Sequence, residues 1–280
     1  MKLTSTLVCA SLLASCAGPG CPVGPQPHFD DDTGLQGFAT EEGSLAGTWG
    51  AVVEFALILQ IAVVGDRNGG SQGLRLLTRT WDPVRKVYAE RFTWCRNEVF
   101  EVEGTKSVTT IETLSKLGAV EWETTVNHET GEYKSNTILD LWGLRNMPDP
   151  IETPLPNNDN YESPPQSDWV FDEDEDGKPG VTANLVGGLN AELNIVTRSA
   201  YVLDGTITSK DKITGLNRVG KNEQSTVKSN NQFAEGESHN RPDPDPKQSW
   251  FDQVRLPDGA TCADVIAALD DGRLHSRRPF

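Results

Sequence analysis

The stretch VEWETTVNHETGEYKSNTILDLW, residues 120–142, gives the clearest indication of the fold. Val120 and Trp122 share one parity with two further small or apolar residues, and acidic or polar side chains stand between them. Such a period of two residues is typical of a β-strand with one buried face. The polar segment 127–131 then predicts a turn into a second strand at 133–142. The stretch therefore predicts a β-hairpin.

Similar patterns recur along the chain, and a Gly- and Pro-rich composition supplies many turns. The β-branched segment 49–64 predicts a buried strand, with a buried helix as the alternative. Thr261 to Leu269 predicts a short capped helix. Asp204-Gly205 predicts a turn, and Ser209-Lys210-Asp211-Lys212 predicts another. Further strands are expected near residues 92–102, 181–186, 193–203, 206–213 and 225–233. These segments together predict an all-β fold, an antiparallel barrel or sandwich of roughly eight to ten strands with long surface loops.

Composition limits the classes of partner. The net charge is −16, which makes nucleic acid and anionic membrane surfaces poor partners. We expect a signal peptide at 1–15 and a lipidated cysteine with a flexible tether at 16–45. A single β-domain should follow at 46–270, with a Pro-rich insertion at 146–167 that runs over the surface. Residues 271–280, which contain a small arginine cluster, are expected to form a solvated tail.

The first sixteen residues carry a processing signal. Leu13-Ala14-Ser15-Cys16 follows one positive charge and a short apolar stretch, and it resembles the lipobox of secreted bacterial lipoproteins. The resemblance implies cleavage before Cys16, lipid on its sulfur and an acyl chain such as palmitate on its amine. Ala17, rather than Asp, then implies sorting to the outer membrane, with the periplasmic or surface side left open. An ordinary secretory signal, cleaved next to a small residue, is the alternative.

The other cysteines are suited to an oxidising envelope. Cys95 lies in a strand pattern and Cys262 in an ordered C-terminal segment, so we expect a Cys95–Cys262 disulfide. Cys21, in the tether, is left over. The alternative is three free thiols.

Gly47-Thr48-Trp49 opens the first strand. It resembles the Gly-x-Trp of lipocalins and the Gly-Thr-Trp of avidins. The resemblance implies a tryptophan that closes one end of an antiparallel barrel around a small ligand. Such a cavity would be lined by Trp49, Phe92, Trp94 and Trp122. The alternative is an ordinary core tryptophan at the start of a strand.

One cluster has the spacing of metal ligands. Asp172, Asp174 and Asp176 alternate in an acidic run, and Gly177 permits a sharp turn after them. The pattern resembles the calcium loops of EF-hands, dockerins and thrombospondin type 3 repeats. It departs from the EF-hand because the twelfth position, which is a Glu there, is Ala183 here. We expect a structural Ca²⁺ site that also uses the backbone carbonyl of Lys178. The alternative is a solvated acidic turn.

Catalytic motifs are weak, and no catalytic residue is assigned. Ser225-Thr226-Val227-Lys228 matches the Ser-x-x-Lys of penicillin-recognising acylases but lacks the companion motifs. The sequence therefore favours a lipid-anchored envelope protein that binds a small apolar ligand or a protein partner. A hydrolase with a pair of carboxylates is the alternative, and it would need a cleft with two carboxyl groups about 5–9.5 Å apart.

Overall fold

A computed structural model describes residues 34–61, 65–188, 190–238 and 240–278. The predictions for residues 1–16 and for Cys21 concern positions outside these ranges. The strands and helices, in chain order, are β1 (Gly47–Ile61), β2 (Gly65–Asp82), β3 (Val87–Val99), β4 (Thr105–Val108), α1 (Ile111–Lys116), β5 (Val120–Asn127), β6 (Glu132–Ser135), β7 (Ile138–Trp142), η2 (Gln166–Asp168), β8 (Val181–Gly187), β9 (Ala191–Ser209), β10 (Lys212–Ser229), η3 (Gln232–Ala234), β11 (Gly236–Ser238), β12 (Arg241–Pro242), η4 (Pro246–Gln248), β13 (Trp250–Arg255) and α2 (Cys262–Asp270).

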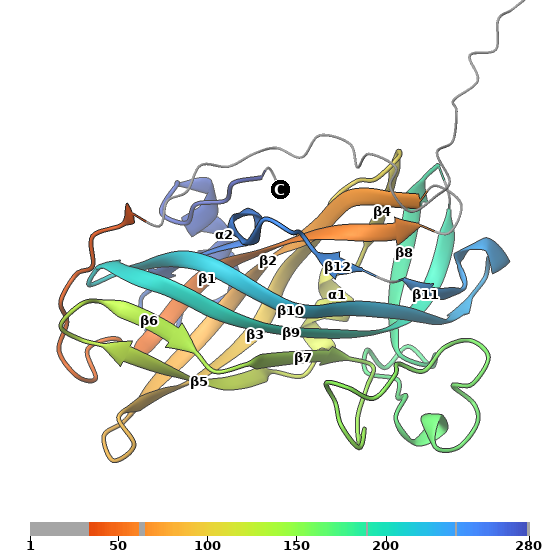
Figure 1. Ribbon diagram of the computed structural model, residues 1–280, viewed down its shortest axis with the longest axis horizontal. Coiled ribbons are helices and arrows are strands. Elements are labelled where there is room, and N and C mark those ends of the chain that lie inside the picture. The colour runs from red at the N-terminus through yellow and green to blue at the C-terminus, as the bar shows by residue number, and fades with distance from the viewer. Residues whose placement is uncertain (1–33, 62–64, 189, 239, 279–280) are drawn as a thin grey trace, which may run out of the picture.

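The main strands close into an antiparallel barrel (Figure 1). In the described residues, strands pair in the order β1, β2, β3, β5, β6, β9, β10 and β13, and β13 pairs again with β1. β7 and β8 follow β6 along the same edge of β9. The all-β prediction is confirmed. Because the strands form a closed ring, the fold is the barrel of the two predicted alternatives. Closure also removes the free edges that an open main sheet would present.

The predicted hairpin at 120–142 is confirmed as β5 and β6, with β7 after a short break. Alternation along these strands separates an inner from an outer face, as the period of two requires. β2 shows the same alternation, although the sequence pattern did not reveal this strand. Its inner positions include Arg75 and Arg79, both buried, while Thr78 and Thr80 are exposed. The charged inner residues hide the apolar period.

One barrel end is covered by the residues that precede β1. The Trp49 indole Nε1 donates to the Leu45 carbonyl at 3.0 Å, and the Arg255 guanidinium lies 4.7 Å from the centre of the indole ring. Arg255 also donates to the carbonyls of Ala46 (2.8 Å) and Ser44 (2.6 Å). The first and last strands of the ring are thereby joined at this end.

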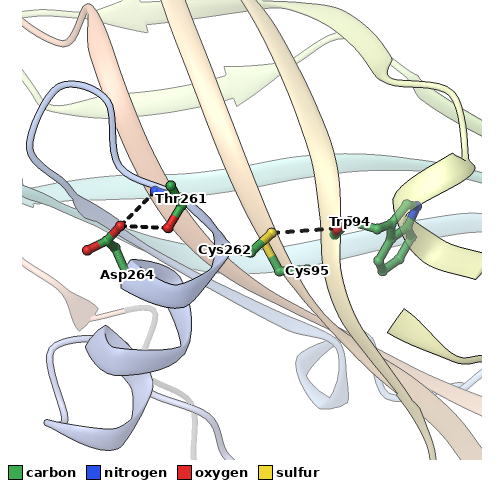
Figure 2. Close-up of a disulfide and its surroundings, with 5 residues drawn as sticks. All are labelled: Trp94, Cys95, Thr261, Cys262 and Asp264. Carbon is green, nitrogen blue, oxygen red and sulfur yellow. Dashed lines mark hydrogen bonds between the residues drawn. A yellow bond between two sulfur atoms is a disulfide. The ribbon is translucent and has the colours of Figure 1, made fainter. Parts of the chain in front are cut away.

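A disulfide joins α2 to the outer face of the barrel (Figure 2). Cys95 and Cys262 are bonded, as the sequence predicts. Cys95 is the extra residue where the register of β2 and β3 shifts, so it faces outward while Trp94 faces the interior. The predicted helix is also confirmed, and the amide and hydroxyl of Thr261 both donate to the Asp264 carboxylate at its start (Figure 2).

The predicted turn at Asp204-Gly205 is wrong. β9 continues through it, and the chain reverses at residues 210–211, which confirms the predicted turn at 209–212. Gly205 lies opposite Gly215, and a Cβ on Gly205 would approach Phe251 Cζ to 2.6 Å. This glycine therefore permits close packing of Phe251 against β9 and β10 rather than a turn. β10 also differs from the predicted strand at 225–233. It begins earlier, at Lys212, and is much longer than that predicted strand.

The C-terminal residues are not the solvated tail that the sequence suggested. Leu274 is buried under α2, and the Arg277 guanidinium lies 3.9 Å from the Trp250 ring centre. Ser276 Oγ and the Arg277 backbone N–H both donate to Glu54 on the outer face of β1. This segment covers polar side chains that would otherwise be the outward face of the barrel.

The described part of the predicted tether also contributes to the fold. The Phe38 amide donates to the Ile207 carbonyl at 2.8 Å, and Leu45 is buried in the main core. The folded domain therefore begins before residue 46. None of the helices in the described ranges is long and apolar enough to cross a membrane.

Candidate metal centre

The acidic run forms a closed loop between β7 and β8, at the barrel end that also holds α1 (Figure 1). Both ends of the loop are fixed. The Phe171 amide donates to the Gly143 carbonyl, and the Gly180 amide donates back to the Phe171 carbonyl at 3.0 Å. Gly177 has a positive φ of 83°, which glycine adopts without a Cβ penalty. The prediction that Gly177 permits a sharp turn after the aspartates is confirmed.

The three predicted aspartates converge. Asp172, Asp174 and Asp176 each offer a carboxylate oxygen, and these atoms lie within 4.8 Å of one another. Asp172 also accepts hydrogen bonds from the amides of Asp176 (3.1 Å) and Gly177 (2.8 Å), which hold the loop around it. This group can hold a metal ion. Oxygen-only donor sets of this kind suit hard cations.

Asp174 is the least accommodated member of the group. The residue is 3% exposed; its Oδ2 accepts from the Thr182 amide at 3.0 Å, and its Oδ1 is buried with no hydrogen-bond partner. Burial raises the pKa of Asp174, and the charges of Asp176 and Asp172 raise it further. A buried carboxylate oxygen without a partner is costly. A cation between the three carboxylates would remove that cost.

Asp176 is held differently. Its two oxygens accept from the Lys178 amide at 2.9 Å and from the Thr182 hydroxyl at 2.6 Å. Burial acts to raise the pKa of Asp176, but these hydrogen bonds and the Lys178 ammonium outweigh it and lower the pKa. That ammonium lies 3.4 Å from Asp176 and 2.8 Å from Glu192. The role of the Lys178 carbonyl as a fourth ligand stays a prediction.

The four residues predicted to line a ligand cavity are all buried. The rings of Phe92 and Trp94 are 5.5 Å apart, and those of Phe92 and Trp122 are 5.7 Å apart. Trp49 lies at the covered end of the barrel, with the Arg79 guanidinium 4.6 Å from its ring. The aromatic side chains thus pack against one another and against buried arginines.

The interior also holds a polar group that the sequence analysis missed. The Arg75 guanidinium lies 4.2 Å from the Phe92 ring centre and 4.4 Å from that of Trp94. It donates to the Tyr201 hydroxyl, and its Nη2 is 4.0 Å from Asp140 Oδ2. Nε and Nη2 of Arg75 are buried without a hydrogen-bond partner. Burial raises the pKa of Asp140 to about 6, although the charge of Arg75 opposes the shift.

Hollows on the described surface include two near the strands that carry the predicted cavity residues. One, of about 350 Å³, lies between β3, β4 and α1 and is lined by polar and apolar side chains, Leu114 among them. Glu98 bridges Arg96 and Lys106 there. The other, of about 610 Å³, lies on β2, β3 and β5 and includes Trp122 and Glu123. Neither hollow reaches Phe92 or Trp94.

A comparison of the chain with family models, with curated proteins and with solved structures found no match.

Proposed function

We propose that this chain is an exported, lipid-anchored envelope protein whose β-barrel is a binding domain stabilised by Ca²⁺. The carboxylates of Asp172, Asp174 and Asp176 would hold the ion. The observation that carries the calcium part is the buried, unpartnered Oδ1 of Asp174 within a group of three converging carboxylates. A hydrogen-bonded acidic turn that remained free in solvent would not need to bury that oxygen.

Calcium suits this loop better than magnesium. Ca²⁺ accepts six to eight oxygen ligands in flexible geometry, whereas Mg²⁺ requires a near-ideal octahedron and retains several waters. The three aspartates, the Lys178 carbonyl and water would supply a suitable set. Extracellular calcium modules bind with Kd values of about 10⁻⁴–10⁻³ M. At 1 mM Ca²⁺ and a Kd of ~10⁻⁴ M, binding would stabilise the native state by about 1.4 kcal/mol.

Isothermal titration of the EGTA-treated protein with CaCl₂ and with MgCl₂ tests this site. We expect one Ca²⁺ per chain and weaker binding of Mg²⁺. Asp174→Asn should weaken Ca²⁺ binding by more than tenfold, because it removes the charge of the buried ligand. Asp159→Asn is the matched control, since Asp159 is an exposed acid in the Pro-rich loop. The absence of binding at 5 mM Ca²⁺ would refute the site.

The envelope location is supported by the Cys95–Cys262 disulfide, because such bonds persist in oxidising compartments. The anchor itself depends on Cys16. Inhibition of lipoprotein signal peptidase, or Cys16→Ser, should block maturation of the expressed precursor. Normal processing under both conditions would contradict lipidation.

For the binding role, a protein partner is better supported than a ligand inside the barrel. Arg75, Phe92, Trp94 and Trp142 contact one another in the interior, and the Trp94 and Trp142 rings are 5.4 Å apart. A solvatochromic apolar probe should therefore gain little fluorescence with the native protein. Stoichiometric uptake of the probe with quenching of tryptophan fluorescence would instead support an internal ligand.

A further inference from the structure

The proposed metal loop is bonded directly to α1. The Lys116 ammonium at the end of α1 donates to the backbone carbonyl of Asp174 at 2.8 Å. The amide of Gly118, just after the helix, donates to Glu173 Oε1 at 3.0 Å. Both acceptors lie within the run of alternating aspartates. Any rearrangement of that run therefore moves the atoms to which α1 is attached.

Glu173 also ties the loop to the barrel wall. Its second oxygen accepts from the Gly143 amide at 2.6 Å, immediately after β7. Glu173 therefore connects the loop both to the segment just after α1 and to the residue just after β7.

α1 has little stability of its own. It contains six residues, and a helix of this length is marginal without tertiary support. Its support comes from the Thr110 cap, the contacts with the loop and the burial of Leu114, which is 2% exposed. The loop is therefore one of three supports of this short helix.

Leu114 links α1 to two further regions. It belongs to the core cluster that contains Phe92 and Trp94, and it also lines the 350 Å³ hollow at β3 and β4. Thr110 and Ile111 line the same hollow. The helix is thus the wall between the hollow and the aromatic interior.

We infer that metal occupancy of the aspartate loop is transmitted to α1 through Lys116 and Glu173, and that it fixes the shape of the hollow beside this helix. The inference rests on the proposed calcium site. With the metal bound, the hydrogen bonds of α1 would be kept, which is the closed state of the helix. Without the metal, these hydrogen bonds would break, and α1 would open, more often.

Hydrogen exchange measured by mass spectrometry on the full chain tests the coupling. We expect Ca²⁺, relative to EGTA, to slow exchange in the peptide that spans 110–118 by at least tenfold. The amide of Leu114, which is hydrogen-bonded to Thr110, and the amide of Gly118, which is hydrogen-bonded to Glu173, should account for most of the effect. The peptide from α2 is the internal control, because α2 is attached to the outer face by the disulfide. Asp174→Asn should abolish the response.

Lys116→Met tests the route. It should retain Ca²⁺ binding by calorimetry, but the effect of Ca²⁺ on exchange in 110–118 should fall at least threefold. Lys134→Met, at an exposed position on β6, is the matched control and should respond like the wild type.

The outcomes separate the two proposals. If Ca²⁺ binds but exchange in 110–118 does not change, the coupling is wrong and the calcium site stands. If Lys116→Met responds in full, the proposed route is wrong. If calorimetry shows no Ca²⁺ binding, the site and the coupling both fail.

Discussion

Reduction of the Cys95–Cys262 disulfide should destabilise the protein strongly without unfolding it. The two cysteines are separated by 167 positions in the chain. In the chain-entropy treatment, a cross-link that closes a loop of this length lowers the entropy of the unfolded chain by about 17 cal/mol/K, which corresponds to about 5 kcal/mol at 25 °C. Residual structure in the unfolded chain reduces this value, so we expect a loss of about 3–5 kcal/mol.

The native state should survive reduction, because α2 has other attachments. Val265 and Ala268 are buried against the barrel, and Thr261 caps the helix through Asp264. Equilibrium urea unfolding of the oxidised protein, of the reduced protein and of Cys262→Ala provides the measurement. The two forms without the disulfide should agree to within about 1 kcal/mol. A loss below about 1 kcal/mol on reduction would refute the chain-entropy reasoning for this bond.

Three further predictions concern the barrel. The raised pKa of Asp140 means that the native state binds more protons than the unfolded state between its ordinary value of 3.8 and about 6, so the stability associated with this group should fall by about 3 kcal/mol as the pH rises through that range. Urea unfolding at pH 4 and pH 7 should show a smaller difference for Asp140→Asn than for the wild type; an equal difference would contradict the assignment. Gly205→Ala should cost at least about 2 kcal/mol in thermal unfolding, because its Cβ would collide with Phe251; a cost below about 0.5 kcal/mol would argue against close packing there. Arg255→Met should cost about 2 kcal/mol through lost contacts with Trp49 and lost hydrogen bonds, and should increase hydrogen exchange at residues 44–46; unchanged exchange would argue against its role in holding that end.

The sequence was informative where the two faces of a strand differ in polarity. In β5, Trp122 faces the interior and Glu121 faces solvent, so the period is visible. β2 lacked that contrast because Arg75 and Arg79 face inward. Their charges are accommodated by Glu90, Asp140 and aromatic rings from other strands. The sequence around the two arginines does not indicate these partners.

In the candidate metal centre, too, the sequence predicts the local features and not the long-range contacts. The aspartates lie within one short loop, so their spacing alone predicts that they converge. The attachments of that loop to α1 join residues far apart in the chain, and Lys116 and Glu173 have no sequence signature. Asp204-Gly205 shows the opposite failure, because a strong turn dipeptide occurs where only a small residue fits beside Phe251. The prediction of a solvated C-terminal tail was wrong for a similar reason. The partners of Arg277, Glu54 and Trp250, lie on other strands, and the local sequence does not indicate them.

The pairing of β1 with β13 also sets the order in which this protein can fold. Arg255 reaches the carbonyl of Ala46 across 209 positions of the chain, so the ring cannot close before nearly the whole chain is available. Contacts of such high sequence separation fold slowly, because the entropy of a long loop is lost before they form. Until then β1, which is among the most apolar segments of the chain, presents an unpaired edge that can associate with other chains. Timely protection of β1 during synthesis is therefore a requirement built into the topology.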